Sequence, residues 1–162
     1  MLQDIVLAGG CFWGVEAYFK RVKGVVDTEV AYANGDLADP SYEDVCRNTT
    51  GHAEVVKITY DDEVVTLENL LKHFFRIIDP TTLNRQGPDV GSQYRTGIYY
   101  VDPADAVTAI DWIDSVRADY DRPIVTEVEP LTSYYPAEEY HQDYLDKNPG
   151  GYCHIDLSGM QD

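Results

Sequence analysis

The chain has 162 residues, of which 44% are hydrophobic, and this length and composition predict one folded domain with a substantial core. Its formal net charge of −17, from 29 acidic and 12 basic residues, argues against nucleic acid as a partner, because phosphate binding needs clustered lysine and arginine. No apolar run is long enough to cross a bilayer and the first residues lack the pattern of a signal peptide, so we expect a cytoplasmic protein without a membrane partner.

Strands and helices alternate along the chain in the pattern of an α+β fold. In chain order we expect a strand at residues 5–8, a helix at 15–20, strands at 22–33 and 53–60, a helix at 66–78, a polar loop at 79–93, a strand at 96–101, a helix at 103–120, a strand at 124–128 and a helix at 137–147. The first six of the strands and helices match the split β-α-β order of a ferredoxin-like two-layer sandwich. We therefore predict a single domain over residues 1–162, with a long C-terminal coil from about residue 148.

The cysteine at the first strand-to-helix junction is the first candidate for chemistry. Cys11 follows the apolar strand and precedes the predicted helix, so its thiol is expected near the first free N–H groups of that helix. Those donors and the positive end of the helix dipole favour a thiolate. From the residues alone, a buried and unreactive cysteine is an equal alternative. The other cysteines, Cys46 and Cys153, complete no disulfide scaffold and no common zinc motif, so we expect no metal or other cofactor.

Four polar stretches could supply partners for Cys11: residues 11–16, 41–54, 84–95, and the C-terminal residues 140–142 with 150–154. A thiol near carboxylates and phenols suits nucleophilic catalysis with assisted proton transfer. Each candidate also has a structural alternative: Glu54 as a surface acid, Tyr42 and Tyr94 as packing residues, Asp89 as a turn cap, and His52 and His141 as structural histidines.

Together these stretches resemble the peptide-methionine (S)-S-oxide reductases, the A-type methionine sulfoxide reductase family. The matching motifs are Gly-Cys-Phe-Trp-Gly at residues 10–14 followed by Glu16, the block at 42–54, Asp-Pro-Thr at 79–81, the block at 84–95 and Tyr-His-Gln at 140–142. They occur in the family's order, and the resemblance covers residues 4–157. It implies a two-layer α+β core wrapped by a long C-terminal coil.

The resemblance also implies a role for each candidate residue. Cys11 is the expected nucleophile, Glu54 the acid that protonates the sulfoxide oxygen, Tyr42 and Tyr94 hydroxyl donors to that oxygen, Asp89 a supporting polar group, Phe12 and Trp13 the cage for the substrate's S-methyl group, and Cys153 the resolving thiol. The expected reaction reduces methionine-S-sulfoxide in oxidised proteins, and in free form, through a sulfenic acid and a disulfide. Thioredoxin or a similar dithiol reductant then recycles the enzyme, which we expect to be a monomer.

Two other classes of function remain open from the residues. A thiol peroxidase or a cysteine-dependent acyl-transfer enzyme would also use Cys11, the latter with His52 or His141 as its base. A non-catalytic module could instead hold oxidised methionine in an aromatic pocket. Within the reductase interpretation, Cys46 is an alternative resolving or relay thiol.

Overall fold

The fold is a curled mixed sheet with helices packed against it. The computed structural model describes the chain except for residues 37, 39, 47–49 and 149–162. The strands are β1 (Leu2–Gly9), β2 (Val25–Ala33), β3 (Ala53–Asp61), β4 (Arg85–Gln86), β5 (Asp89–Val90), β6 (Thr96–Tyr100), β7 (Glu127–Pro130) and β8 (Tyr134–Pro136). The helices are α1 (Phe12–Phe19), α2 (Tyr42–Cys46), α3 (Leu67–Ile77), α4 (Pro103–Val116) and α5 (Tyr144–Lys147), with 3₁₀ turns at Ser92–Tyr94, Arg117–Asp119 and Glu139–His141.

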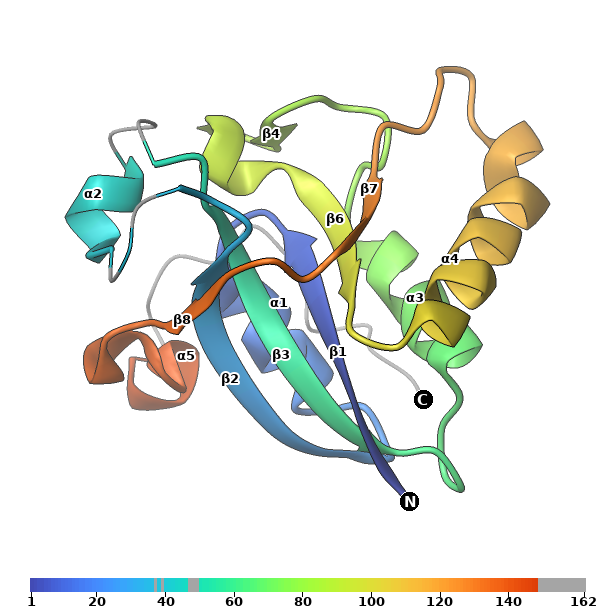
Figure 1. The fold of residues 1–162 in the computed structure, drawn as a ribbon, viewed down its shortest axis with the longest axis horizontal. Helices are drawn as coiled ribbons and strands as arrows, with labels where there is room; N and C mark the ends of the chain where they lie inside the picture. The colour runs from blue at the N-terminus through green and yellow to red at the C-terminus, as the bar shows by residue number, and fades with distance from the viewer. Residues whose placement is uncertain (37, 39, 47–49, 149–162) are drawn as a thin grey trace.

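Six strands form the main sheet in the order β7-β6-β1-β3-β2-β8, and β4 pairs with β5 in a separate hairpin. β1 lies inside the sheet, antiparallel to both β3 and β6. β2 is antiparallel to β3, whereas β7 runs parallel to β6. Figure 1 shows α1 behind the sheet, with α3 and α4 at the side that carries β6. The carboxyl end of β1 therefore leads directly into α1.

The principal core lies between the sheet and the helices α1 and α3. Because side chains alternate along a strand, every second residue of β1, β2 and β3 faces this layer. α3 begins after Thr66, whose hydroxyl accepts the N–H of Asn69. The apolar side chains of α3 that recur at helical spacing and face the core are Leu67, Leu70, Leu71, Phe74 and Phe75. This packing fixes the surface on which α1 rests.

The opposite face of the sheet carries small side chains and is covered by extended chain. Its buried residues include Ala8, Ala31, Ala33 and Ala53. The segment that joins β7 to β8 crosses this face (Figure 1); Leu131 within it and Tyr134, the first residue of β8, pack against this cluster. Because alanine side chains are small, the backbone of an extended segment can approach this face closely. Such a segment therefore covers this face, as helices cover the other one.

Most predicted elements are confirmed, and the largest difference falls near the C-terminal end of the described residues. The predicted helix at 137–147 is wrong, because these residues form a 3₁₀ turn and the four-residue α5, separated by Asp143 in the left-handed region at φ 55°. The strand expected at 124–128 starts at Glu127, and the short elements α2, β4, β5 and β8 were not predicted. The expected C-terminal coil lies almost wholly outside the described residues. No helix among the described residues is long and apolar enough to cross a membrane.

Candidate active site

The turn between β1 and α1 is built so that the backbone passes close to α3. A β-carbon added to Gly9 would lie 2.9 Å from the ring of Phe74, so a larger residue does not fit there without a shift. Gly10 has φ 89°, a conformation that glycine adopts without strain. Cys11 is then the N-cap residue of α1, and it is only 5% exposed. The sequence thus places the thiol at a helix N-terminus, as expected.

Glu54 reaches the same place from β3, where it stands opposite Tyr32 of β2. Its side chain is 1% exposed, and its Oε1 accepts the backbone N–H of Phe12 at 3.3 Å. Its Oε2 is buried and has no hydrogen-bond partner among the described residues. Burial raises the pKa of Glu54 to about 8; the hydrogen bond from Phe12 opposes this rise and the charge of Asp89 adds to it. At neutral pH this carboxyl group therefore holds a proton that it can donate.

Two tyrosine hydroxyls share the surroundings of Glu54. Tyr42 belongs to α2, and Tyr94 to a 3₁₀ turn that contacts β3. Burial, followed by the charge of Glu54, raises the pKa of each phenol well above its ordinary value. The pKa of Tyr94 is raised further by the nearby Cys11 and Asp89. Both phenols are therefore protonated at any physiological pH and can act as hydrogen-bond donors.

An aromatic wall adjoins the thiol. The ring of Trp13 is stacked on that of Tyr144 at 3.9 Å between centroids and 11° between planes, and it also faces Tyr42 at 6.3 Å. Phe12 is 1% exposed and lies 5.3 Å from the imidazole of His141. Trp13 is only partly buried, so the wall has an apolar surface that solvent or a ligand can reach.

The C-terminal segment that supplies this wall is attached to α1 and β2 by buried polar contacts. Glu16 of α1 accepts the backbone N–H of Asp143 at 2.7 Å through Oε1 and the hydroxyl of Thr28 at 3.0 Å through Oε2. Gln142 accepts the backbone N–H of Val30 and donates to its carbonyl, both at 2.9 Å. These bonds replace the helical ladder that the sequence favours at 137–147.

The structure brings together most of the residues that the sequence singles out. The predicted site residues gathered around the β1–α1 turn are Cys11, Phe12, Trp13, Tyr42, Glu54, Asp89 and Tyr94. Cys153 lies outside the described residues. Cys46 is exposed as a residue, but neighbouring groups partly shield its thiol from water, and this partial burial raises its pKa. Within the described part of the chain, no three histidine, cysteine, aspartate or glutamate side chains are arranged to hold a metal ion.

The family model for peptide methionine sulfoxide reductase matches residues 3–162. A peptide methionine sulfoxide reductase MsrA of Alkaliphilus metalliredigens is 61% identical over 156 residues, which are 96% of this chain and 99% of the relative. The chain belongs to this family. It is an enzyme that reduces methionine sulfoxide in proteins, as its relatives do.

Solved structures of the reductase family have the same fold. Mxr1 of Saccharomyces cerevisiae in its reduced form matches with a TM-score of 0.90 and 43% identity, over 94% of this chain and 88% of Mxr1. Mxr1 in complex with Trx2 matches with a TM-score of 0.63 and 30% identity, over 88% of this chain and 84% of that one.

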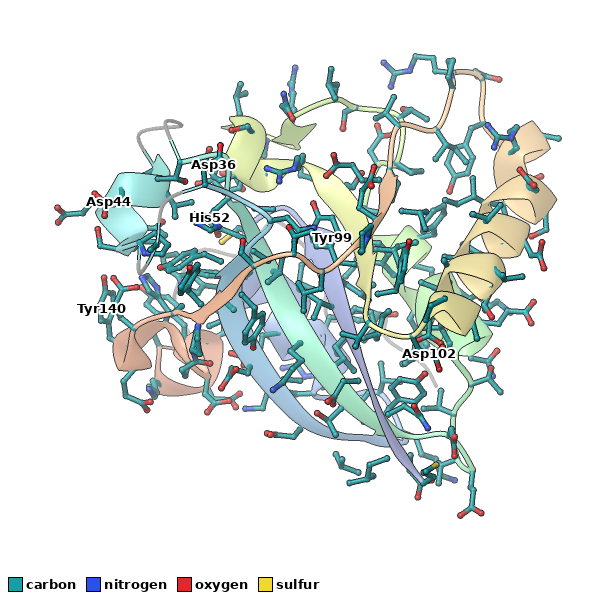
Figure 2. All side chains as sticks on the ribbon, in the orientation of Figure 1. Asp36, Asp44, His52, Tyr99, Asp102 and Tyr140 are labelled. Carbon is teal, nitrogen blue, oxygen red and sulfur yellow. The ribbon has the colours of Figure 1, made fainter. Side chains whose placement is uncertain are left out.

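Three residues near this candidate site were not predicted: Tyr32, Glu138 and Tyr144. Glu138 holds Tyr32 and Tyr42 together, because its Oε1 accepts the Tyr32 hydroxyl at 2.7 Å and its Oε2 accepts the Tyr42 backbone N–H at 3.0 Å. Tyr32 could have been found from the alternation along β2, which directs it to the helix-covered face. Nothing local distinguishes Glu138 or Tyr144 from other acids and tyrosines. Tyr140 donates its hydroxyl to Glu138, and Figure 2 shows it at the edge of the molecule, with His52 nearer α2, just before β3.

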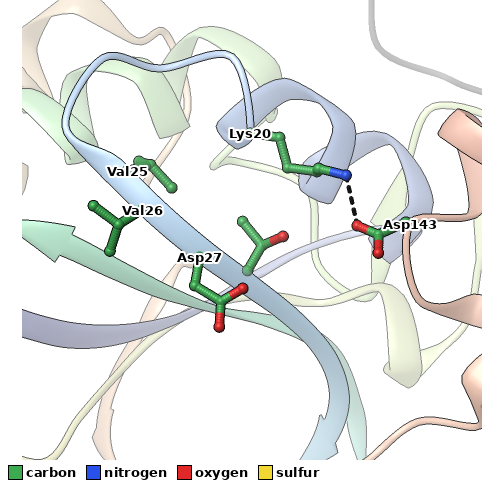
Figure 3. A pocket seen from close by; sticks show the side chains of 6 residues that line it. Lys20, Val25, Val26, Asp27 and Asp143 are labelled. Carbon is green, nitrogen blue, oxygen red and sulfur yellow. Dashed lines mark hydrogen bonds and ion pairs between the residues drawn. The ribbon is translucent and has the colours of Figure 1, made fainter.

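One surface cavity lies apart from these residues. It has a volume of about 290 Å³, is lined by residues 25–28 and lies at the opposite end of α1 from Cys11. Lys20 closes one side through its ion pair with Asp143 at 2.6 Å, as Figure 3 shows. Among the described residues, no thiol, phenol or buried carboxyl group lines it, so it lacks the groups that gather around Cys11.

Proposed function

We propose that the reductase acts on its substrate by nucleophilic attack of the Cys11 thiolate on the sulfoxide sulfur. The observation that carries this proposal is the burial of Glu54, which raises its pKa to about 8, together with its Oε2, which has no hydrogen-bond partner among the described residues. A sulfoxide is a poor electrophile until its oxygen accepts a proton or strong hydrogen bonds. Glu54 supplies the proton, and the hydroxyl groups of Tyr42 and Tyr94 supply the hydrogen bonds.

The first step leaves one oxygen atom on the enzyme. The sulfur of Cys11 forms a bond to the substrate sulfur, whose oxygen has taken the proton of Glu54. The hydroxyl group then moves to the Cys11 sulfur as the substrate S–O bond and the new S–S bond break, so the products are methionine and a cysteine sulfenic acid. The substrate sulfur is reduced by two electrons and the cysteine sulfur is oxidised by two. Asp89 supports this step by raising the pKa of Glu54, which keeps the acid protonated before the attack.

Cys153 resolves the sulfenic acid in our proposal. Its thiol attacks the oxidised sulfur of Cys11, water leaves and a disulfide forms; a dithiol reductant of the thioredoxin type then restores both thiols. The family resemblance supports the role of Cys153, and the solved complex of yeast Mxr1 with Trx2 supports a thioredoxin as partner. Cys46 remains the alternative resolving thiol, because its electrostatic effect on Tyr42 and Tyr94 indicates that it lies near the site.

Selectivity for the S epimer follows from fixing three different substituents of the substrate sulfur. In the proposed arrangement the methyl group packs against Phe12 and Trp13, the oxygen faces the donors, and the sulfur faces Cys11. In the R epimer the oxygen and one carbon substituent exchange places, so the donors are left without an acceptor. The proposed substrates are methionine-S-sulfoxide residues of oxidised proteins, and free methionine sulfoxide as well.

We also infer that the central sheet is of the ferredoxin-like type, in one domain over residues 1–162. The order β6-β1-β3-β2, with α1 after β1 and α3 after β3, supports the split β-α-β arrangement. A monomeric, cytoplasmic enzyme without nucleic-acid or membrane partners remains a prediction from composition.

The reaction is tested by a single turnover without reductant, with N-acetylated methionine-S-sulfoxide and its R epimer as alternative substrates. We expect methionine derivative from the S epimer only, with the loss of two thiols per enzyme. Cys153→Ser should still form about one product per enzyme but should not be recycled by thioredoxin. Sustained turnover of Cys153→Ser with thioredoxin would identify another resolving thiol, and Cys46→Ser in that background would then test Cys46.

The same experiment separates the competing classes of function. Binding of the sulfoxide without product and with all thiols intact would support the non-catalytic module. Rapid consumption of hydrogen peroxide, or a burst with an activated ester, would support another thiol enzyme. Acyl transfer is disfavoured by the surroundings of His141, because its Nδ1 is already bonded to Trp13.

A further inference from the structure

The indole of Trp13 is held by a hydrogen bond as well as by stacking. Its Nε1 lies 2.9 Å from Nδ1 of His141, and the centroids of the two rings are 5.7 Å apart. The ring of Tyr144 is stacked on the same indole. A tryptophan side chain can turn about its outer torsion with little restriction, so stacking alone leaves the direction of the N–H open. The bond to His141 selects one orientation.

The chemistry of the two rings fixes the state of His141. An indole nitrogen can only donate, so Nδ1 of His141 must be the acceptor and must carry no proton. A neutral imidazole with a bare Nδ1 carries its proton on Nε2. Burial lowers the pKa of His141, against the opposing charge of Glu138, and this keeps the ring neutral. Its Nε2 is buried and has no hydrogen-bond partner among the described residues.

His141 is positioned independently of Trp13. It ends a 3₁₀ turn, and the next two residues are anchored elsewhere: Gln142 to the backbone of Val30, and the N–H of Asp143 to Glu16. The imidazole is 1% exposed and lies 4.4 Å from the ring of Tyr42. The acceptor therefore has a place set by β2 and α1, and the indole must adapt to it.

We propose that His141 is a positioning residue for substrate binding, whose Nδ1 orients the indole of Trp13 so that its face meets the S-methyl group of methionine sulfoxide. This inference rests on the proposed role of Trp13 in the methyl-binding wall. His141 itself touches neither the sulfoxide oxygen nor the attacking sulfur in this scheme. Its loss should therefore weaken binding rather than slow the bond-making step.

Two substitutions of His141 distinguish the effect of its hydrogen-bond acceptor from the effect of its aromatic ring. His141→Phe keeps an aromatic ring but removes the acceptor, which leaves the partly buried indole N–H without its partner. His141→Asn loses the ring but returns an acceptor oxygen close to the position of Nδ1. In single turnover with N-acetylated methionine-S-sulfoxide, we expect His141→Phe to raise the half-saturating substrate concentration about tenfold, with a limiting rate within about threefold of the parent. His141→Asn should keep both values within about threefold of the parent.

A matched control tests whether any lost histidine bond has this effect. His73 is also buried and is hydrogen bonded to the hydroxyl of Tyr18 at 2.8 Å, but it belongs to α3, where its ring contacts that of Tyr18. His73→Phe should lower the melting temperature and leave the half-saturating concentration within about twofold of the parent. An increase as large as that of His141→Phe would overturn the proposal.

The orientation itself is read from the indole N–H signal in a ¹H–¹⁵N NMR spectrum. The chain has two tryptophans, Trp13 and Trp112, so Trp112→Phe identifies the signal of Trp13. We expect this signal to be shifted downfield and protected from exchange in the parent and in His141→Asn, and to lose both features in His141→Phe. An unchanged signal in His141→Phe, or an unchanged half-saturating concentration, overturns the proposal. If the parent forms no product while the signal behaves as expected, the proposed function fails and the hydrogen bond stands.

Discussion

Two buried glutamates next to α1 have opposite surroundings. Glu16 and Glu54 are each 1% exposed. Both oxygens of Glu16 accept a hydrogen bond, one from the backbone of Asp143 and one from Thr28. Glu54 accepts only the longer bond from Phe12, and its other oxygen has no partner in the described part of the chain. Burial raises the pKa of both, but only Glu16 has two hydrogen bonds that lower it again.

The difference separates a structural carboxylate from a chemical one. A buried polar group that has all its bonds stabilises the fold, and its removal leaves unpaired donors behind. A buried carboxyl group with an unshared oxygen costs stability, and such a cost is typical of functional sites. Glu16 holds the segment that carries His141 and Tyr144, whereas Glu54 keeps a proton available beside Cys11.

The largest effect should follow from Glu54→Gln, which keeps the shape but cannot donate the acid proton. We expect the limiting rate of single turnover to fall by a factor on the order of 10²–10⁴, the usual contribution of a general acid. The free energy of unfolding should stay the same or rise, since a neutral amide replaces a group that is costly to ionise when buried. A loss of activity below threefold would remove Glu54 from this role.

The pH dependence of the same step should report the raised pKa of Glu54. Its folded-state pKa of about 8 lies above the ordinary value of 4.5, so the native state binds the extra proton between these values. The limiting rate should therefore fall as pH rises through about 8. The free energy of unfolding should decrease over the range from about 4.5 to 8, because the native state binds more protons there than the unfolded chain. In Glu54→Gln the fall in the limiting rate should be absent, and the decrease in the free energy of unfolding should be smaller, because Glu16 also has a raised pKa.

The smallest effect on chemistry should follow from Glu16→Gln. The amide nitrogen must then face one of two donors, the N–H of Asp143 or the hydroxyl of Thr28, so we expect a loss of about 1–3 kcal/mol in the free energy of unfolding measured with urea. The limiting rate should stay within about threefold of the parent, because Glu54 and Cys11 are unaltered. A rate loss comparable to that of Glu54→Gln would erase the distinction between the two glutamates.

The sequence predicts the parts of the molecule that depend on local pattern. Alternation and helical spacing identify β1, β2, β3, β6, α1, α3 and α4, and the residues around Cys11 mark the site. The helix predicted at 137–147 fails because its polar groups bond to distant partners. The N–H of Asp143 goes to Glu16 and the side chain of Gln142 to Val30, contacts that span more than a hundred residues. No local pattern encodes such contacts. The hydrogen bond from the Tyr42 N–H to Glu138 is equally invisible to local pattern.

The bond between Trp13 and His141 joins residues that are 128 positions apart. When about 130 residues of the nascent chain have left the ribosome, β1 can pair with β3 and β6, but the ring of Trp13 still lacks the segment that orients it. Contacts so distant in sequence carry a high cost of loop closure and form late in folding. The growing polypeptide therefore can form the β6-β1-β3-β2 part of its sheet before it has a finished active site.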